Sequence, residues 1–473
     1  MNCSLRVVAA LTLAVAAGGC AAASAQAGVS PSRVVSGAGF GVEDFSVAMN
    51  PAGARYAVAF VGARGTRVQV LTRLGRGDRL QAVRRLENLR ERSGRGGFVR
   101  ISDPMTAVAR DGDAIAAWIV TTVARRDAQP SYRLRVSTTS SNGSFRRPST
   151  LVSSRSSQLD LTGVVAGRRG RAVVSWLRGN RVEVFVRRAS RFGARQVIGS
   201  SRDFDGPPEL AMSPSGAAVA AWTPTPGSSA MASVLRATGQ RFGRARRVSS
   251  AGERTAYARA VAGPGGTGVA WTVAAPSTAP AAGVLRFARM RSGAGAFAAP
   301  VTIAALDTDG APHVALPRLG VATAWRHFTV HTEPGDTDSI TASRLQASAS
   351  WLAGAAPRGL SESPSLALRP VLAALGDRAL VAWREAPEYN AGTPVRLAVA
   401  TADGWQPTVT LPLGEPVEGS PSRTFGIDAG ERRSANDLAI AAGARGALLA
   451  WVTHTSSADG HATGRLRVAA YQP

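Results

Sequence analysis

The feature that most constrains this sequence is a short phrase that it repeats eight times. In residues 211–222 (AMSPSGAAVAAW) the phrase is a small apolar run, a turn that contains Gly216, a second apolar run and Trp222. Variants return about every 50 residues, a period typical of architectures that stack one supersecondary unit many times. Each copy ends at an aromatic residue, and these residues are Phe60, Trp118, Trp176, Trp222, Trp271, Trp325, Trp383 and Trp451.

Each copy predicts a β-hairpin whose two strands are buried. The apolar runs on either side of the turn are nearly continuous rather than alternating, which is typical of strands covered on both faces. The glycine between the runs supplies the tight connection. We expect the aromatic residue to fill the space between neighbouring sheets, because the rest of the phrase offers only small side chains.

A second phrase follows each hairpin and predicts two outer strands. Residues 132–137, 182–187 and 395–400 alternate between apolar and polar side chains, as half-exposed strands do. A turn and an aromatic residue then lead into a further apolar run. Each unit therefore has four strands, and tandem four-stranded units are typical of an all-β fold, the β-propeller. Eight phrases predict eight blades, and seven is the alternative if the divergent first copy is not a true blade.

The two ends of the chain predict how the ring closes. Residues 33–39 (RVVSGAG) are similar to residues 247–252 (RVSSAG), the fourth strand of an internal unit, whereas the chain ends with a third strand at 466–470. An N-terminal strand that completes the last blade leaves no sheet edge unpaired. No linker divides the chain, so residues 26–473 are predicted to form a single propeller domain. Two polar segments are predicted to be loops, 84–100 and 414–436.

The first 25 residues predict export. Arg6 precedes an apolar run, 7–17, that has the length of a signal-peptide core and is too short to span a bilayer. Cleavage after Ala25 would follow an Ala-x-Ala site. Alternatively, residues 17–20 (AGGC) resemble the lipobox of bacterial lipoproteins, although Ala17 stands where a large aliphatic residue is usual, and Cys20 would then carry the lipid. We expect an extracellular or cell-surface protein of a bacterium, attached to the membrane only through that lipid.

Cysteine content adds a constraint on stability. The two cysteines are Cys3 and Cys20, and Cys3 lies in the segment that export would remove. The mature chain is therefore predicted to have no disulfide, so that packing alone must hold it together. No later apolar run is long enough to cross a membrane as a helix.

The charge is strongly positive, and every basic residue is arginine. The chain has 56 Lys and Arg against 31 Asp and Glu, a formal net charge of +25. One interpretation is a surface that binds anions, and the other is a codon bias toward arginine. Arginine does not alternate with aromatic stacking residues, so no specific nucleic-acid partner is predicted. Arginine clusters such as 168–171, 187–188 and 244–247 fall mostly on turns and outer strands opposite the acidic loops, which predicts an electrostatically two-sided molecule.

Candidate binding residues gather in one set of loops. In a propeller, the connections from strand four to strand one and from strand two to strand three open on the same face, here called the top face. By this assignment most acids and all five histidines lie there. The candidate ligand-binding residues are His327, His331, Glu333, Asp336, Asp338, Glu385, Glu388, Tyr389, His454, Asp459 and His461. They indicate either a polar funnel for a sugar, a cationic group or Ca²⁺, or ordinary solvated turn residues.

No motif assigns a catalytic residue or a metal ligand. The sequence contains no G-x-S-x-G, no H-E-x-x-H and no P-loop. His327 and His331 are four apart and would share a face only on a helix, whereas this loop reads as extended. We therefore predict no required cofactor, with Ca²⁺ as the one ion that the acidic loops could hold.

The hairpin phrase resembles those of bacterial secreted β-propellers. It is distantly similar to the Asp-box of sialidases, Ser-x-Asp-x-Gly-x-x-Trp, and to WD40-like repeats. Here a full strand separates Gly112 from Trp118, and the Asp occurs in that copy alone. We expect an envelope-associated, non-enzymatic module that binds a ligand or a protein. The alternatives are a sialidase-like glycoside hydrolase and a structural protein that binds anionic envelope polymers. The partner would be a glycan, an envelope polymer or a protein, and the chain a monomer.

Overall fold

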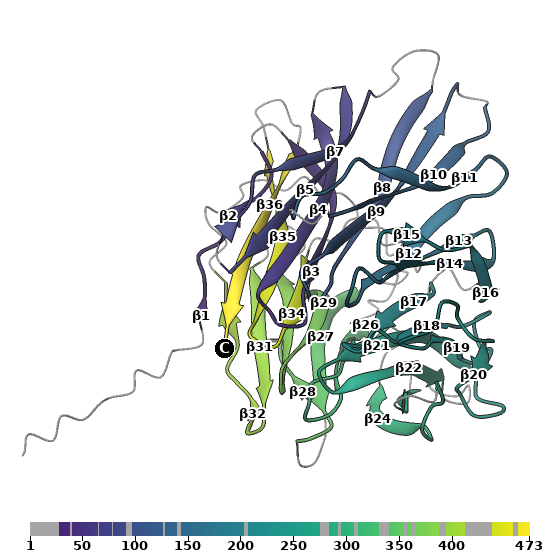
Figure 1. The fold of residues 1–473 in the computed structure, drawn as a ribbon. Helices are drawn as coiled ribbons and strands as arrows, with labels where there is room; N and C mark the ends of the chain where they lie inside the picture. The colour runs from purple at the N-terminus through teal and green to yellow at the C-terminus, as the bar shows by residue number, and fades with distance from the viewer. Residues whose placement is uncertain are drawn as a thin grey trace, which may run out of the picture.

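The chain is an all-β protein built of eight blades (Figure 1). Six blades are separate sheets, and the sixth and seventh join into one sheet where Ser343 pairs with Leu366. The structure, a computed structural model, describes residues 28–37, 40–64, 66–77, 79–90, 97–125, 128–139, 143–202, 207–274, 283–291, 295–306, 311–330, 340–352, 357–361, 366–386, 394–411, 438–456 and 462–473. Within these ranges every regular element is a strand. None of the described segments is a helix that could span a membrane.

The first four blades follow one another along the chain. Blade 1 contains β3 (Gly41–Met49), β4 (Arg55–Arg64), β5 (Arg67–Arg76), β6 (Arg79–Leu80) and β7 (Arg84–Arg90). Blade 2 contains β8 (Phe98–Val108), β9 (Ala114–Val123), β10 (Ser131–Thr138) and β11 (Ser149–Ser154). Blade 3 contains β12 (Leu159–Ala166), β13 (Ala172–Arg178), β14 (Arg181–Arg188), β15 (Arg191–Phe192) and β16 (Gln196–Ser200). Blade 4 contains β17 (Glu209–Met212), β18 (Ala218–Trp222), β19 (Met231–Leu235) and β20 (Arg246–Arg247).

The second half of the chain repeats this order. Blade 5 contains β21 (Thr255–Gly263), β22 (Gly266–Ala274), β23 (Gly283–Arg289) and β24 (Val301–Leu306). Blade 6 contains β25 (His313–Ala315), β26 (Ala322–Val330), β27 (Ile340–Ala349) and β28 (Arg358–Gly359). Blade 7 contains β29 (Leu366–Leu375), β30 (Arg378–Ala386), β31 (Val395–Thr401), β32 (Gly404–Trp405) and β33 (Val409–Thr410). Blade 8 contains β34 (Leu438–Gly443), β35 (Gly446–Ser456) and β36 (Ala462–Gln472), joined by β1 (Gly28–Val29) and β2 (Arg33–Val34).

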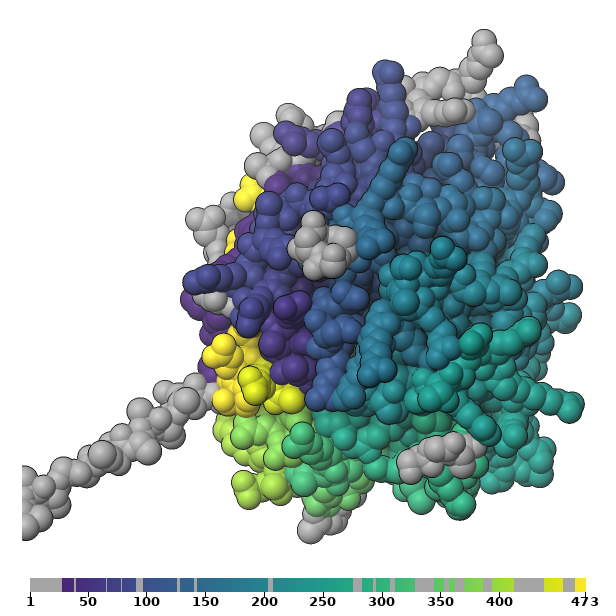
Figure 2. Space-filling view, in the orientation of Figure 1, coloured from purple at the N-terminus to yellow at the C-terminus, as the bar shows by residue number. Residues whose placement is uncertain are grey.

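The blades form a closed ring. The first strand of each blade lies beside the first strand of the next, and β34 of blade 8 lies beside β3 of blade 1. The yellow strands of blade 8 accordingly adjoin the purple strands of blade 1 (Figure 1), and the blades pack directly against one another on the side seen in Figure 2. The eight-bladed propeller predicted from the repeats is confirmed, and the first copy of the phrase is a true blade.

The N-terminal segment closes the ring, as the sequence predicts. Val34 of β2 pairs with Arg467 of β36, and Gly28 of β1 pairs with Gln472 of the same strand. Side chains add to this pairing, because the Leu466 amide donates a hydrogen bond of 3.1 Å to Ser36 Oγ. The last blade thus takes its outer strand from the opposite end of the chain, so β36 does not present an open edge.

The aromatic residue of each phrase forms the contact between blades. All eight are at most 1% exposed. Trp118 of blade 2 packs against Ala57 and Ala59 of blade 1, and Phe60 of blade 1 packs against Leu448 of blade 8. The same pattern holds around the ring, with one such core cluster at each blade boundary. These aromatic residues are therefore scaffold.

One predicted loop is wrong. The polar segment 84–100 contains β7, the fourth strand of blade 1, and the start of β8. The arginine-rich sequence of this segment is compatible with a strand, because an outer strand needs apolar side chains on only one face. Leu86, which is 8% exposed, lies on that face. The other predicted polar loop, 414–436, lies outside the described residues.

Candidate functional site

Three of the predicted site residues lie on strands rather than in loops, which corrects the sequence assignment. His327 lies in β26, Glu385 in β30 and His454 in β35, each two or three residues after its blade's tryptophan. These second strands continue past the tryptophan because their partner strands are equally long; His327 pairs with Arg344, and His454 with Gly464. The remaining predicted positions lie outside the described residues, namely Cys20, His331, Glu333, Asp336, Asp338, Glu388, Tyr389, Asp459 and His461.

Glu385 has a structural partner. Its side chain is 5% exposed, and its carboxylate lies 2.9 Å from the Nε of Arg396 on the neighbouring strand. Arg396 itself stands directly opposite Trp383 in the β30–β31 register. The carboxylate that the sequence offered as a ligand group is therefore engaged in an ion pair within blade 7.

A different set of polar residues lies on the innermost strands, near the ends that follow the top-face loops. Several of these strands carry a β-bulge there, for example between Ser102 and Met105 in β8 and between Ala256 and Arg259 in β21. Within these two bulges Asp103 and Tyr257 have positive φ values of 53° and 51°. Such a backbone is uncommon outside glycine and unfavourable for a bulky residue, and bulges redirect side chains near functional sites.

Blades 1 to 3 place carboxylates near the start of these strands. Asp44 and Asp160 each precede the residue that pairs with the blade's aromatic, and Asp103 lies in the bulge one position farther along its strand. Asp44 Oδ1 accepts a hydrogen bond of 2.7 Å from the Phe45 amide. Ser102 Oγ donates to Asp103 Oδ2 at 3.1 Å, and Gln158 Nε2 donates to Asp160 Oδ1 at 2.6 Å.

Blades 4 to 6 carry residues of mixed charge two positions farther along the innermost strands than Asp44 and Asp160. Glu209, Arg259 and His313 each pair with the residue that precedes the blade's tryptophan, so they share one level. Arg259 Nη1 lies 3.4 Å from Glu209 Oε1, which links blades 4 and 5. Burial, followed by the positive charges of Arg259 and Arg326, lowers the pKa of His313 from its ordinary value of 6.5 to about 3. His313 is therefore neutral at physiological pH and can both donate and accept a hydrogen bond.

We call Asp44, Asp103, Asp160, Glu209, Tyr257, Arg259 and His313 the inner-strand ring. The sequence analysis placed most acids on the top face but did not single out the ring. Alignment of the copies on their aromatic residue provides a partial signal, because it puts Arg259 and His313 in one slot and Glu209 one position away. Among the residues that the structure describes, no three His, Cys, Asp or Glu side chains converge as a metal site requires.

Comparison with known proteins gives no family. No family model matches the sequence, and no curated protein matches it. Among solved structures, the chain is similar to the Hadza microbial sialidase Hz136, with 11% identity and a TM-score of 0.38 over 60% of this chain and 63% of the sialidase. It thus spans less than two thirds of that protein. It is also similar to the β-propeller domain of the trilobed protease from Pyrococcus furiosus, with 6% identity and a TM-score of 0.41 over 81% of this chain and 98% of that domain.

A third similar structure is the acylaminoacyl peptidase of Pyrococcus horikoshii, with 8% identity and a TM-score of 0.39 over 87% of this chain and 57% of the peptidase. All three TM-scores are below 0.5, so none of these similarities indicates an activity. The β-propeller fold of this chain follows from its own strand pairing.

Proposed function

We propose that this chain is an exported binding module that engages a glycan at the inner-strand ring. The observation that carries the proposal is the left-handed backbone of Asp103 and Tyr257, two non-glycine residues in equivalent bulges of blades 2 and 5. A conformation that costs on the order of 1–3 kcal/mol persists where the surrounding structure holds it for a purpose. Here it sets a carboxylate and a phenol among the other polar groups of the ring.

The chemistry of the ring suits a sugar. Carboxylates on blades 1 to 3 accept hydrogen bonds from hydroxyl groups, and Arg259 on blade 5 donates to hydroxyl oxygens. Neutral His313 serves either role. Tyr257 adds an aromatic face on which a sugar ring can stack. A ligand that both donates and accepts hydrogen bonds around its whole edge fits these donors and acceptors better than a simple cation or anion does.

A sialidase-like hydrolase is the second candidate, because the ring contains a tyrosine, Tyr257, close in sequence to the Glu209-paired Arg259. The ion pair of 3.4 Å between Glu209 and Arg259 favours binding over catalysis, since it engages the Glu209 carboxylate with a guanidinium group. Export of the chain remains part of the proposal and rests on the segment that ends at Ala25.

The test is a glycan-array measurement on residues 26–473, with and without Ca²⁺, followed by titration of the best ligand. Asp103→Asn and Glu209→Gln should weaken binding about tenfold each, which corresponds to roughly 1.4 kcal/mol. Asp403→Asn, an exposed carboxylate in the turn between β31 and β32, is the matched control and should leave binding unchanged. Unchanged binding in folded Asp103→Asn and Glu209→Gln would overturn the site. Hydrolysis of sialosides that is lost in Tyr257→Phe would select the hydrolase.

A further inference from the structure

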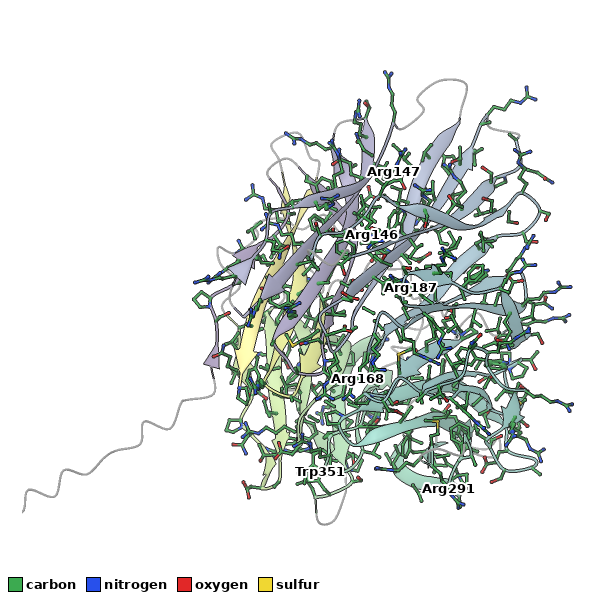
Figure 3. All side chains as sticks on the ribbon, viewed as in Figure 1. Arg146, Arg147, Arg168, Arg187, Arg291 and Trp351 are labelled. Atoms are coloured by element: carbon green, nitrogen blue, oxygen red, sulfur yellow. The ribbon has the colours of Figure 1, made fainter. Side chains whose placement is uncertain are left out.

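The face opposite the top face, here called the bottom face, carries a dense group of arginines on blades 2 and 3. The turns between strands one and two, and between strands three and four, open on this face. In the described turns 109–113, 143–148, 167–171 and 187–192, the basic residues are Arg110, Arg146, Arg147, Arg168, Arg169, Arg171, Arg187, Arg188 and Arg191. The acids of these turns are Asp111 and Asp113. We call these nine arginines the arginine sector; Arg147, Arg146, Arg187 and Arg168 follow one another in Figure 3.

Hydrogen bonds and charges connect the turns of this sector. Asp111 Oδ2 accepts a hydrogen bond of 2.9 Å from the Arg169 amide, which joins blade 2 to blade 3. Burial and the neighbouring Asp111 raise the pKa of Asp113, whereas Arg187, Arg146 and Arg55 oppose that shift. The two carboxylates are therefore already surrounded by arginines of three blades and leave most of the sector's positive charge uncompensated.

Two guanidinium groups of the sector are buried and donate hydrogen bonds to backbone carbonyl groups. Arg171, 6% exposed, donates to the carbonyl oxygens of Arg236, Ala237 and Gly239 at 2.8, 2.8 and 2.7 Å. Arg187, 8% exposed, donates to the Gly170 carbonyl at 2.7 Å. Burying a charge is costly unless an opposite charge compensates it. Asp113 offsets part of the charge of Arg187, whereas Arg171 lies near the like charge of Arg188. These cations fix the turns and add to the positive potential of the sector.

The exposed members of the sector are placed to use that potential. Arg146, Arg147, Arg168, Arg169 and Arg188 are exposed around the two buried cations. Guanidinium groups bind phosphate oxygens through paired, charge-assisted hydrogen bonds, and they stay charged at any physiological pH. The aromatic residues in the described turns of the sector are Phe145, which is 2% exposed, and Phe192, which is half-buried and packs against Phe185 with ring centroids 6.1 Å apart. Neither ring is fully exposed for stacking on a base.

We propose that the arginine sector is a binding site for a linear phosphate-bearing polymer. Its row of exposed guanidinium groups would contact successive phosphates, and the buried Arg171 and Arg187 would hold the turns in place and strengthen the local field. This site is separate from the inner-strand ring and does not depend on the glycan proposal.

The experiment uses inorganic polyphosphate as the probe and residues 26–473 as the protein, at about 150 mM salt. The double variant Arg168→Gln/Arg188→Gln removes two exposed cations of the sector. Its matched control, Arg155→Gln/Arg202→Gln, removes two exposed arginines of the same blade neighbourhood outside the bottom-face turns. Both double variants lose the same net charge, and equal thermal midpoints establish that both are folded.

We expect the sector variant to bind polyphosphate at least about tenfold more weakly, with a shallower dependence of affinity on salt by roughly two released counterions. The control should change less than about twofold. Equal losses in the two variants, or no binding at this salt concentration, would overturn the proposal. Equal affinity for polygalacturonate would overturn the assignment to phosphate, and tighter binding of single-stranded DNA would reassign the site to nucleic acid.

Discussion

The indole of Trp222 in blade 4 lies against the backbone of Gly199 in blade 3, and a Cβ atom at position 199 would overlap its six-membered ring. Gly199 belongs to β16, the outer strand, so the aromatic residue of the phrase reaches across the blade boundary to a strand of the preceding unit. The fit depends on a missing side chain in one blade and a large one in the next.

The contact predicts a stability cost on both sides. Gly199→Ala should lower the free energy of unfolding by about 1–3 kcal/mol because it overpacks the boundary. Trp222→Ala should lower it by about 3–5 kcal/mol because it leaves a cavity. Denaturant unfolding measures both. In the double variant, Gly199→Ala should cost little further unfolding free energy, because the indole ring that the new methyl group would meet is absent. Strictly additive losses of unfolding free energy in the two single variants would contradict the contact.

The low pKa of His313 predicts a specific pH dependence. The folded-state value of about 3 lies below the ordinary 6.5, so the unfolded chain binds more protons over this range. His313 therefore costs nothing above pH 6.5, and its destabilising effect grows as the pH falls from 6.5 toward 3. His313→Asn should flatten the loss of unfolding free energy in this window relative to the parent chain. The carboxylates titrate in both proteins, so parallel pH curves would show that His313 is not the cause.

The ion pair between Glu385 and Arg396 predicts that Glu385 is structural. Glu385→Gln should reduce the free energy of unfolding by about 1–3 kcal/mol, because it weakens a charge-assisted contact of a buried group. Binding of the glycan found in the array should be unchanged in the folded variant. A variant of full stability that lost the ligand would return Glu385 to the binding site.

Closure by the N-terminal strands predicts an effect of truncation. A chain that starts at Phe40 lacks β1 and β2, which leaves β36 as an open edge. We expect a lower thermal midpoint and a tendency to self-associate compared with residues 26–473. Light scattering and thermal unfolding report the two effects, and a monomer of unchanged stability would show that the ring does not need this closure.

The proposed export of the chain makes Cys20 a testable residue. If it is lipidated, Cys20→Ala should move the protein from the membrane fraction to the medium. If cleavage follows Ala25, the variant and the parent chain should both appear in the medium, and the lipoprotein alternative would be abandoned. Fractionation and immunoblotting distinguish the two outcomes.

The architecture could be predicted from the sequence because its signals are local and repeated. A turn glycine and a terminal aromatic residue, Gly216 and Trp222 in the fourth unit, recur in every unit, and a buried hairpin needs only small apolar runs, a turn and one large side chain. The closing strand at 33–34 was also readable, since it copies an internal fourth strand. The strand at 84–90 could not be predicted from the sequence, because only its pairing with β5 shows which of its polar residues face outward.

The sites depended on the tertiary structure. The length of the partner strand sets how far a second strand runs past its tryptophan. His327, Glu385 and His454, which the sequence analysis expected in loops, therefore lie on strands. Glu209, Arg259 and His313 are each about 50 residues apart and acquire a common level only when the blades close into a ring. The sequence by itself determined the repeating unit and its buried face, since these follow from local periodicity. Only the ring decided which charged residues meet, because that depends on contacts between blades.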